Sequence, residues 1–266
     1  MEDRQELGDG PTPRRTLASS TDDRKPMIAV LIALALVQTT VCGAEAAALM
    51  KSATQRAAAF DLAGAVQQMQ AAAKSGCAEA MLPALYLRGW IAARDAYRLG
   101  GSPESLRPVL QSIATLQDTL GKSGPPQIAA LVLQAAAAAA QSERDELAFM
   151  IDYAVQLEDR NLTEKRSALP MISAHEAAGD LWLQVHRYDD ARRAYARATE
   201  RIGITPRITL GLARLAVRID ALATACKQYQ SLVASWTAAG QEPPELSEAR
   251  TFLTSPACRG SVTQRP

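Results

Sequence analysis

Apolar residues from Ala44 onward recur with the period of an α-helix. Two sets of four share a spacing of three, four and three residues: Leu62, Ala65, Met69 and Ala72, and Leu106, Val109, Ile113 and Leu116. Residues at these intervals lie on one face of a helix, and that face packs against a neighbour. The pattern therefore predicts an all-α chain.

Turn and capping residues divide the predicted helices into pairs. We expect helices at 44–58 and 61–75, at 78–98 and from 102 onward, and on either side of residue 142. A fourth pair is expected after the polar stretch 158–167, and a fifth from Thr205 to about residue 240. A short helix at about 244–253 would cover the apolar end of the last pair, followed by a disordered tail at 255–266.

A short phrase recurs near the carboxyl end of the chain. Ala191, Tyr195 and Ala198 are echoed 34 residues later by Ala225, Tyr229 and Leu232, a period typical of helical-hairpin arrays. With Gly179, Trp182 and Tyr188 before the first copy, the segment resembles a tetratricopeptide repeat. The stretch 72–80 is similar to the helix junction of the related Sel1-like repeats.

The resemblance implies an α-solenoid of about five helical hairpins over residues 44–254, a superhelix with a capping helix at its end. It also implies that the repeat residues pack helices together rather than bind a ligand. These packing residues are Gly179, Trp182, Tyr188, Ala191, Tyr195, Ala198, Ala225 and Tyr229.

In tetratricopeptide proteins the first helices of successive repeats line a groove that binds partners. Carried over with Gly179 as the reference position, the resemblance implies that the groove contains Glu176, Asp180, Gln184, Arg207, Arg214 and Arg218. Two interpretations stay open. The opposite charges satisfy each other between neighbouring helices, which we favour, or the arginines bind a carboxylate of a partner. A helix carrying Trp90, Arg94 and Tyr97 is a second candidate surface, although its aromatic spacing favours packing.

The amino-terminal region has the features of a targeting segment. Residues 27–43 are uncharged and follow Arg24 and Lys25, as in a secretory signal peptide, with small residues beyond for cleavage after Gly43 or Ala46. The same residues approach the length of a membrane anchor, so a tether through 27–44 is the alternative. Lipid attachment at Cys42 is a third option that the preceding Val41 disfavours. Residues 1–26 are expected to be a disordered extension.

Cleavage after Gly43 would leave three of the four cysteines, Cys77, Cys226 and Cys258. An odd number in an exported protein predicts at most one internal bridge and at least one free thiol. We expect Cys226 to pair with Cys258, tying the tail to the last hairpin. The alternative is that Cys226 is a buried small hydrophobe.

Charge and motifs exclude several classes of function. Lysine and arginine total 29 against 28 acidic residues, a net charge of +1 that predicts no nucleic-acid partner. The two histidines, His175 and His186, lack the partners of a zinc motif, and no nucleophile elbow or phosphate-binding loop occurs. We expect no catalytic residue, metal or cofactor.

These observations favour an exported, periplasmic or secreted protein that is not an enzyme. Its expected task is protein interaction or assembly in the cell envelope, through an unidentified protein or peptide partner. A membrane-anchored structural component of an envelope complex is the alternative, and an enzyme is the third choice.

Overall fold

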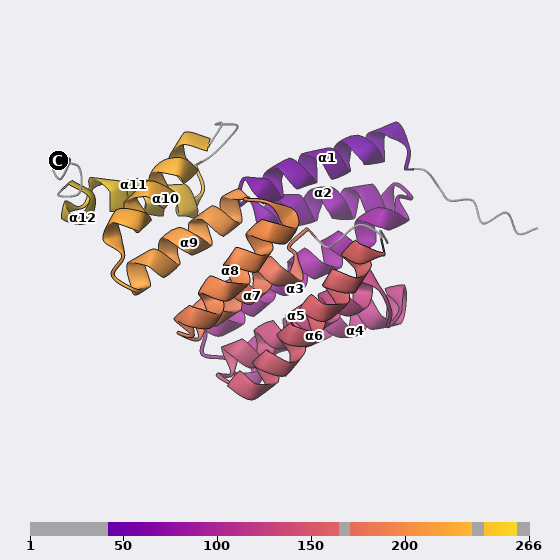
Figure 1. Ribbon diagram of the computed structural model, residues 1–266. Coiled ribbons are helices and arrows are strands. Elements are labelled where there is room, and N and C mark those ends of the chain that lie inside the picture. The colour runs from indigo at the N-terminus through magenta and orange to yellow at the C-terminus, as the bar shows by residue number, and fades with distance from the viewer. Residues whose placement is uncertain (1–41, 165–170, 236–241, 260–266) are drawn as a thin grey trace, which may run out of the picture. The chain divides into compact units, whose positions relative to one another are not determined.

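In the computed structural model of the protein, the residues described are 42–164, 171–235 and 242–259. All regular structure within these ranges is helical, which confirms the predicted all-α class (Figure 1). The first six helices are α1 (Ala44–Ala58), α2 (Leu62–Lys74), α3 (Met81–Arg98), α4 (Pro103–Leu120), α5 (Pro125–Ala140) and α6 (Arg144–Thr163), with a 3-10 turn η1 (Ala78–Ala80) before α3. The others are α7 (Ala174–Gln184), α8 (Tyr188–Ile202), α9 (Pro206–Arg218), α10 (Leu222–Ser235), α11 (Pro244–Thr254) and α12 (Pro256–Arg259).

Local sequence explains where many of these helices begin. The side chains of Asp61, Ser102, Ser173 and Thr205 each accept a hydrogen bond from a backbone N–H in the first turn that follows. These N–H groups have no partner inside the helix, so the side-chain cap stabilises the helix start. Proline stands at the first positions of α4, α5, α9 and α11, where its missing N–H costs nothing.

Helices that follow each other in the chain pack in pairs. The pairs are α1 with α2, α3 with α4, α5 with α6, α7 with α8, and α9 with α10. The first helices of successive pairs also contact each other, α3 with α5, α5 with α7 and α7 with α9. Residues from different parts of the chain are thereby brought to one face of these first helices.

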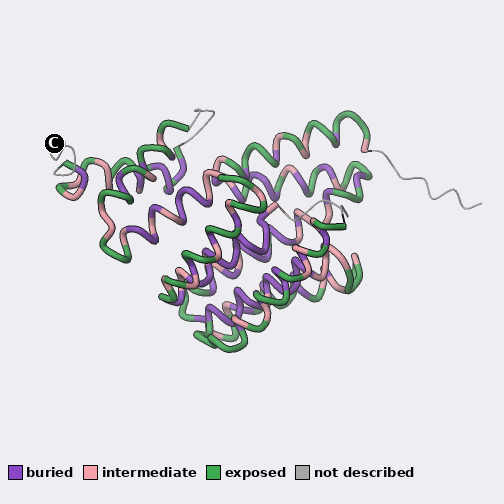
Figure 2. Tube along the Cα trace, in the orientation of Figure 1, coloured by how far each residue is buried: buried purple, intermediate pink, exposed green. Residues whose placement is uncertain are grey.

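Small side chains let the helices approach closely in the centre. Every residue of the alanine run 135–140 on α5 is buried (Figure 2). On the neighbouring helix α3, a Cβ added at Gly89 would lie 2.5 Å from the Leu133 side chain of α5. A larger residue at position 89 would therefore force the Leu133 side chain to move.

A second apolar cluster joins the α1–α2 turn to the carboxyl-terminal helices. Phe60, which has a left-handed backbone conformation, belongs to one buried apolar cluster with Leu210 of α9, Tyr229 of α10 and Ala249 of α11. The first hairpin thus contacts the last one directly.

Two predicted boundaries are wrong. Helix α6 continues to Thr163 through the first part of the stretch 158–167, because Glu158 and Asn161 are buried against the protein rather than exposed in a loop. The tail is helical at Pro256–Arg259, where the bonded Cys258 holds it. Other expectations fall outside the described ranges. They concern the amino-terminal extension 1–26, most of the targeting segment 27–43, and the end of the tail at 260–266.

Within the described ranges, no helix combines the length and the apolar composition that crossing a bilayer requires.

Candidate functional site

A cavity of about 740 Å³ opens on the face shared by α3, α7 and α9, with α11 beside them. Aromatic and arginine side chains dominate its lining. Helix α3 contributes Trp90, Arg94, Tyr97 and Arg98, helix α7 contributes Asp180, Leu183 and Gln184, helix α9 contributes Arg207, Arg214 and Arg218, and helices α10 and α11 contribute Tyr229, Glu245 and Glu248.

The residues expected to pack the repeat lie behind this cavity. Tyr195 of α8 is fully buried, and its hydroxyl donates a hydrogen bond to Asp180 at 2.7 Å. A Cβ added at Gly179 or Gly211 would lie closer than 3.0 Å to the Tyr195 ring. The other expected packing residues are also buried, apart from the partly exposed Tyr188: Trp182, Ala191, Ala198, Ala225 and Tyr229.

Arg207 binds the two acids expected beside it. Its Nε contacts the Glu176 carboxylate, and its Nη2 lies 3.1 Å from Asp180. Burial raises the pKa of Glu176, and Arg207 opposes that rise. Glu176 is only 3% exposed, so a partner in the cavity cannot touch it.

Arg214 has a different partner from those considered in the sequence. It forms a two-point ion pair with Glu248 of α11, at 3.0 Å from Nε and 2.6 Å from Nη2, and Tyr229 donates a hydrogen bond to the same carboxylate. Burial pushes the pKa of Glu248 up, but these hydrogen bonds and the arginine charge hold it below its usual value. Helix α11 lies outside the repeat, so the repeat register carried no signal for Glu248.

Arg218 is the cavity arginine that remains available. It is exposed at the end of α9 and forms no ion pair with another described residue. Arg218 can therefore contact an incoming carboxylate without first breaking an ion pair to a described residue. Gln184 lines the same cavity, and its backbone carbonyl accepts a hydrogen bond from the Tyr97 hydroxyl at 3.0 Å.

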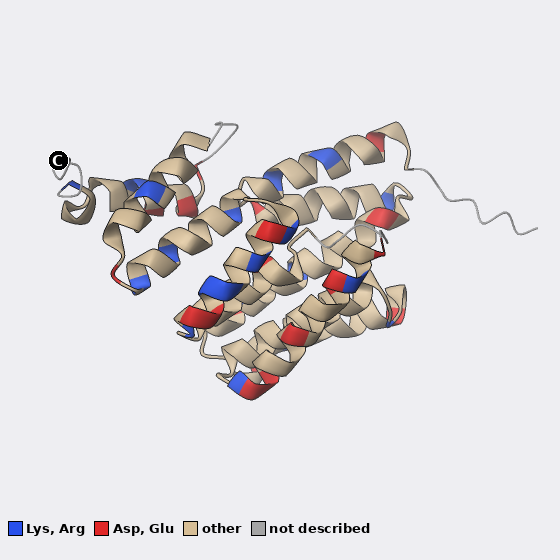
Figure 3. Cartoon of the chain, in the orientation of Figure 1, with Lys and Arg blue, Asp and Glu red and all other residues tan. Residues whose placement is uncertain are grey.

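The aromatic residues on the α3 side of the cavity were expected to pack in the core, and this holds for only one of the two that line it. Trp90 is buried, whereas Tyr97 is 37% exposed at the rim. Arg94 lies 3.6 Å from Glu245 of α11, and burial lowers its pKa although Glu245 opposes this. Five arginines and three acids line the cavity, so its lining carries an excess of positive charge. Along the described helices as a whole, basic and acidic residues are intermixed (Figure 3).

A buried polar cluster lies behind α7. Glu158 of α6 accepts a hydrogen bond from the His175 backbone N–H at 3.2 Å, and burial raises the pKa of Glu158 to about 7. The His175 ring lies 3.0 Å from Asp159, and it is 1% exposed. A substrate cannot reach this imidazole, so the pair acts in packing. His186 lies at the surface, with Nδ1 3.1 Å from the Tyr188 hydroxyl.

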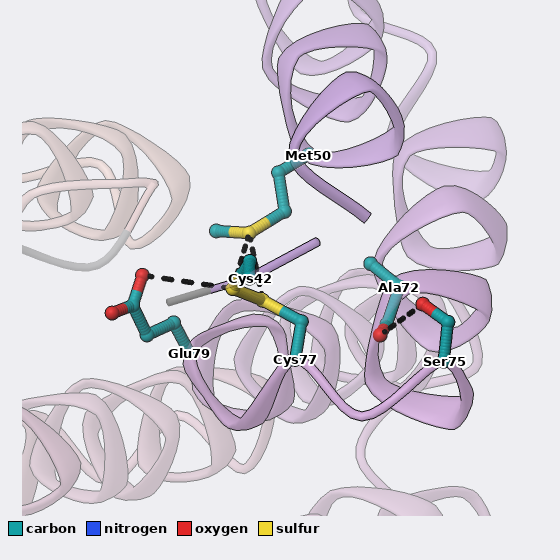
Figure 4. The surroundings of a disulfide bond; sticks show 6 residues. All are labelled: Cys42, Met50, Ala72, Ser75, Cys77 and Glu79. Atoms are coloured by element: carbon teal, nitrogen blue, oxygen red, sulfur yellow. Dashed lines mark hydrogen bonds between the residues drawn. A yellow bond between two sulfur atoms is a disulfide. The ribbon is translucent and has the colours of Figure 1, made fainter. Parts of the chain in front are cut away.

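The cysteines correct one expectation. Cys226 pairs with Cys258, but Cys42 is also bonded, to Cys77 (Figure 4). All four cysteines are therefore paired, and the expected free thiol is absent. The expectation of a free thiol arose because cleavage after Gly43 would remove Cys42 and leave three cysteines. The fold instead places Cys42 next to Cys77, at a Cα–Cα distance of 4.9 Å.

Comparisons of the chain with protein-family models, with curated proteins and with solved structures found no match.

Proposed function

We propose that this protein is an exported, non-catalytic α-solenoid of the tetratricopeptide type that binds a segment of a partner protein in the cavity between α3, α7 and α9. The observation that carries the proposal is that these three helices are the first members of their hairpins and line one cavity together. In that arrangement the protein mediates interaction or assembly in the cell envelope.

The chemistry of the lining favours an acidic peptide segment. Arginine binds carboxylates in two-point fashion, and Tyr and Trp supply apolar contact area, as in binding hot spots. Arg218 forms no ion pair with any other residue that the structure describes. Arg214 is only 39% exposed and is paired with Glu248, and Arg207 is mostly covered. Arg218 is therefore the first contact for a ligand carboxylate.

Two features support export. The chain carries two disulfides, which persist in oxidising compartments. The uncharged segment 27–43 follows a basic pair, as in a secretory signal. Together they favour a periplasmic or secreted protein.

The binding test uses fluorescence anisotropy with acidic, neutral and basic peptides of equal length. Arg218→Glu should raise the Kd for acidic peptides by about 10-fold, roughly 1.4 kcal/mol, because it replaces an attraction by a repulsion. The matched control is Arg88→Glu on α3, an exposed arginine outside the cavity. Equal Kd values for Arg218→Glu and Arg88→Glu would reject this site.

One observation favours a second candidate, a membrane-tethered component of an envelope complex. Cleavage after Gly43 would sever Cys42 from the chain that it is bonded to. Retention of residues 27–43 keeps this bridge within one polypeptide. Amino-terminal sequencing and intact mass of the protein purified from cells decide between the two, because a chain beginning beyond residue 43 removes the tether.

A further inference from the structure

Four side chains with metal-binding atoms meet beside the α1–α2 hairpin (Figure 4). The sulfur of Met50 on α1 lies 3.2 Å from Cys77 Sγ and 4.0 Å from Cys42 Sγ. A Glu79 carboxylate oxygen lies 4.0 Å from Cys42 Sγ. The sulfurs thus come from the segment before α1, from α1 itself and from the α2–η1 connection.

We propose that this sulfur cluster (Cys42, Met50 and Cys77) is a Cu(I) site when the Cys42–Cys77 bridge is reduced. Thiolate and thioether ligands are soft and select Cu(I). Cys77 is buried, whereas Cys42 and Met50 are partly exposed, which leaves a path for the ion from solvent. The inference is independent of the peptide-binding function, but it requires that Cys42 stay in the chain, as in the membrane-tethered alternative.

The redox step is a thiol–disulfide exchange. Two molecules of a thiol reductant supply two electrons and two protons, the Cys42–Cys77 S–S bond breaks, and one new disulfide forms between the reductant molecules. Binding of Cu(I) then displaces the protons of both cysteine thiols, while Met50 contributes a lone pair and no proton. Because two protons leave, the affinity should rise with pH.

The second disulfide provides an internal comparison. Among the described residues, the only group of three or more cysteine, histidine or acidic residues placed to hold a metal contains Cys42 and Cys77. No methionine contact is formed by Cys226 or Cys258 in that part of the chain. We therefore expect Cu(I) to bind tightly at Cys42 and Cys77 and not at Cys226 and Cys258.

The test titrates reduced full-length protein with Cu(I) against a chromogenic Cu(I) chelator. We expect one tightly held equivalent, absent from the oxidised protein. Met50→Leu should weaken binding by at least about 10-fold, the cost typical of losing even an outer-shell partner. Met150→Leu on α6 is the matched control and should bind as the wild type does.

Cysteine variants complete the test. Cys226→Ser/Cys258→Ser should keep the tight equivalent, and Cys42→Ser/Cys77→Ser should lose it. Met50→Leu is conservative, so it remains decisive if a cysteine variant fails to fold. Wild-type affinity in Met50→Leu, or tight binding of Zn(II) but not Cu(I), would overturn the assignment.

Discussion

Tyr195 sets the spacing of three helices. It projects from α8, and its ring lies against Gly179 of α7 and Gly211 of α9. Its hydroxyl holds Asp180, which also contacts Arg207. The same tyrosine that marks the sequence repeat therefore positions two of the side chains that line the cavity.

Gly211→Ala tests this close approach. The new Cβ would lie closer than 3.0 Å to the Tyr195 ring, and overpacking of this kind costs about 1–3 kcal/mol. A gain in helix propensity of up to about 1 kcal/mol offsets part of it. We expect a net loss in the free energy of unfolding, measured by urea denaturation. In a Tyr195→Leu background the loss should shrink, and an equal loss in both backgrounds would contradict the contact.

At the scale of the element, α7 is held at its amino terminus by another helix. Ser173 caps it locally, and the Glu158 carboxylate of α6 accepts the N–H of His175. The cap at Ser173 is readable from the sequence. The role of Glu158 is not, because a charged residue with polar neighbours predicts an exposed turn, and only the packing of α6 against α7 buries it.

Glu158 makes stability depend on pH. Burial raises its pKa from about 4.5 to about 7, so the folded protein binds this proton more tightly than the unfolded chain does. Its contribution to the free energy of unfolding is therefore full below pH 4.5 and is lost as pH rises through 7. At about 1.4 kcal/mol per unit this amounts to roughly 3 kcal/mol.

Glu158→Gln keeps an acceptor oxygen but does not titrate. The wild type minus Glu158→Gln difference in unfolding free energy should fall between pH 4.5 and 7 and stay constant above it, in urea denaturation at each pH. Other titrating groups, such as His175, whose pKa burial lowers, largely cancel in the difference. A difference that is constant with pH would show that Glu158 is not protonated in the folded protein.

At the scale of the whole described protein, the first hairpin is tied to the last through Phe60. The contact joins these two hairpins directly, although three helix pairs lie between them in the sequence. Phe60 also borders the arginine-lined cavity. In a repeat array each unit usually contacts only its neighbours. The Phe60 contact thus adds a long-range constraint on α9, the helix that carries Arg214 and Arg218.

Phe60→Ala should destabilise the carboxyl-terminal helices most. Truncating a buried phenylalanine costs about 3–5 kcal/mol. Hydrogen exchange should speed up at amides of α10 and α11 while α5 keeps its protection. Phe149→Ala is the control, because that side chain is 66% exposed and should have little effect. Uniform acceleration throughout the chain would argue against a specific tie.

The sequence by itself determined the helices and their pairing. These follow from apolar periodicity, side-chain caps and proline positions, which act within a few residues of the chain. It also predicted that Arg207 lies beside Glu176 and Asp180, since a repeat register relates neighbouring hairpins. Only the tertiary structure decided that Arg214 binds Glu248, that Phe60 reaches α9 and that Cys42 meets Met50 and Cys77. Such contacts join distant segments, and their geometry depends on how all the intervening helices stack.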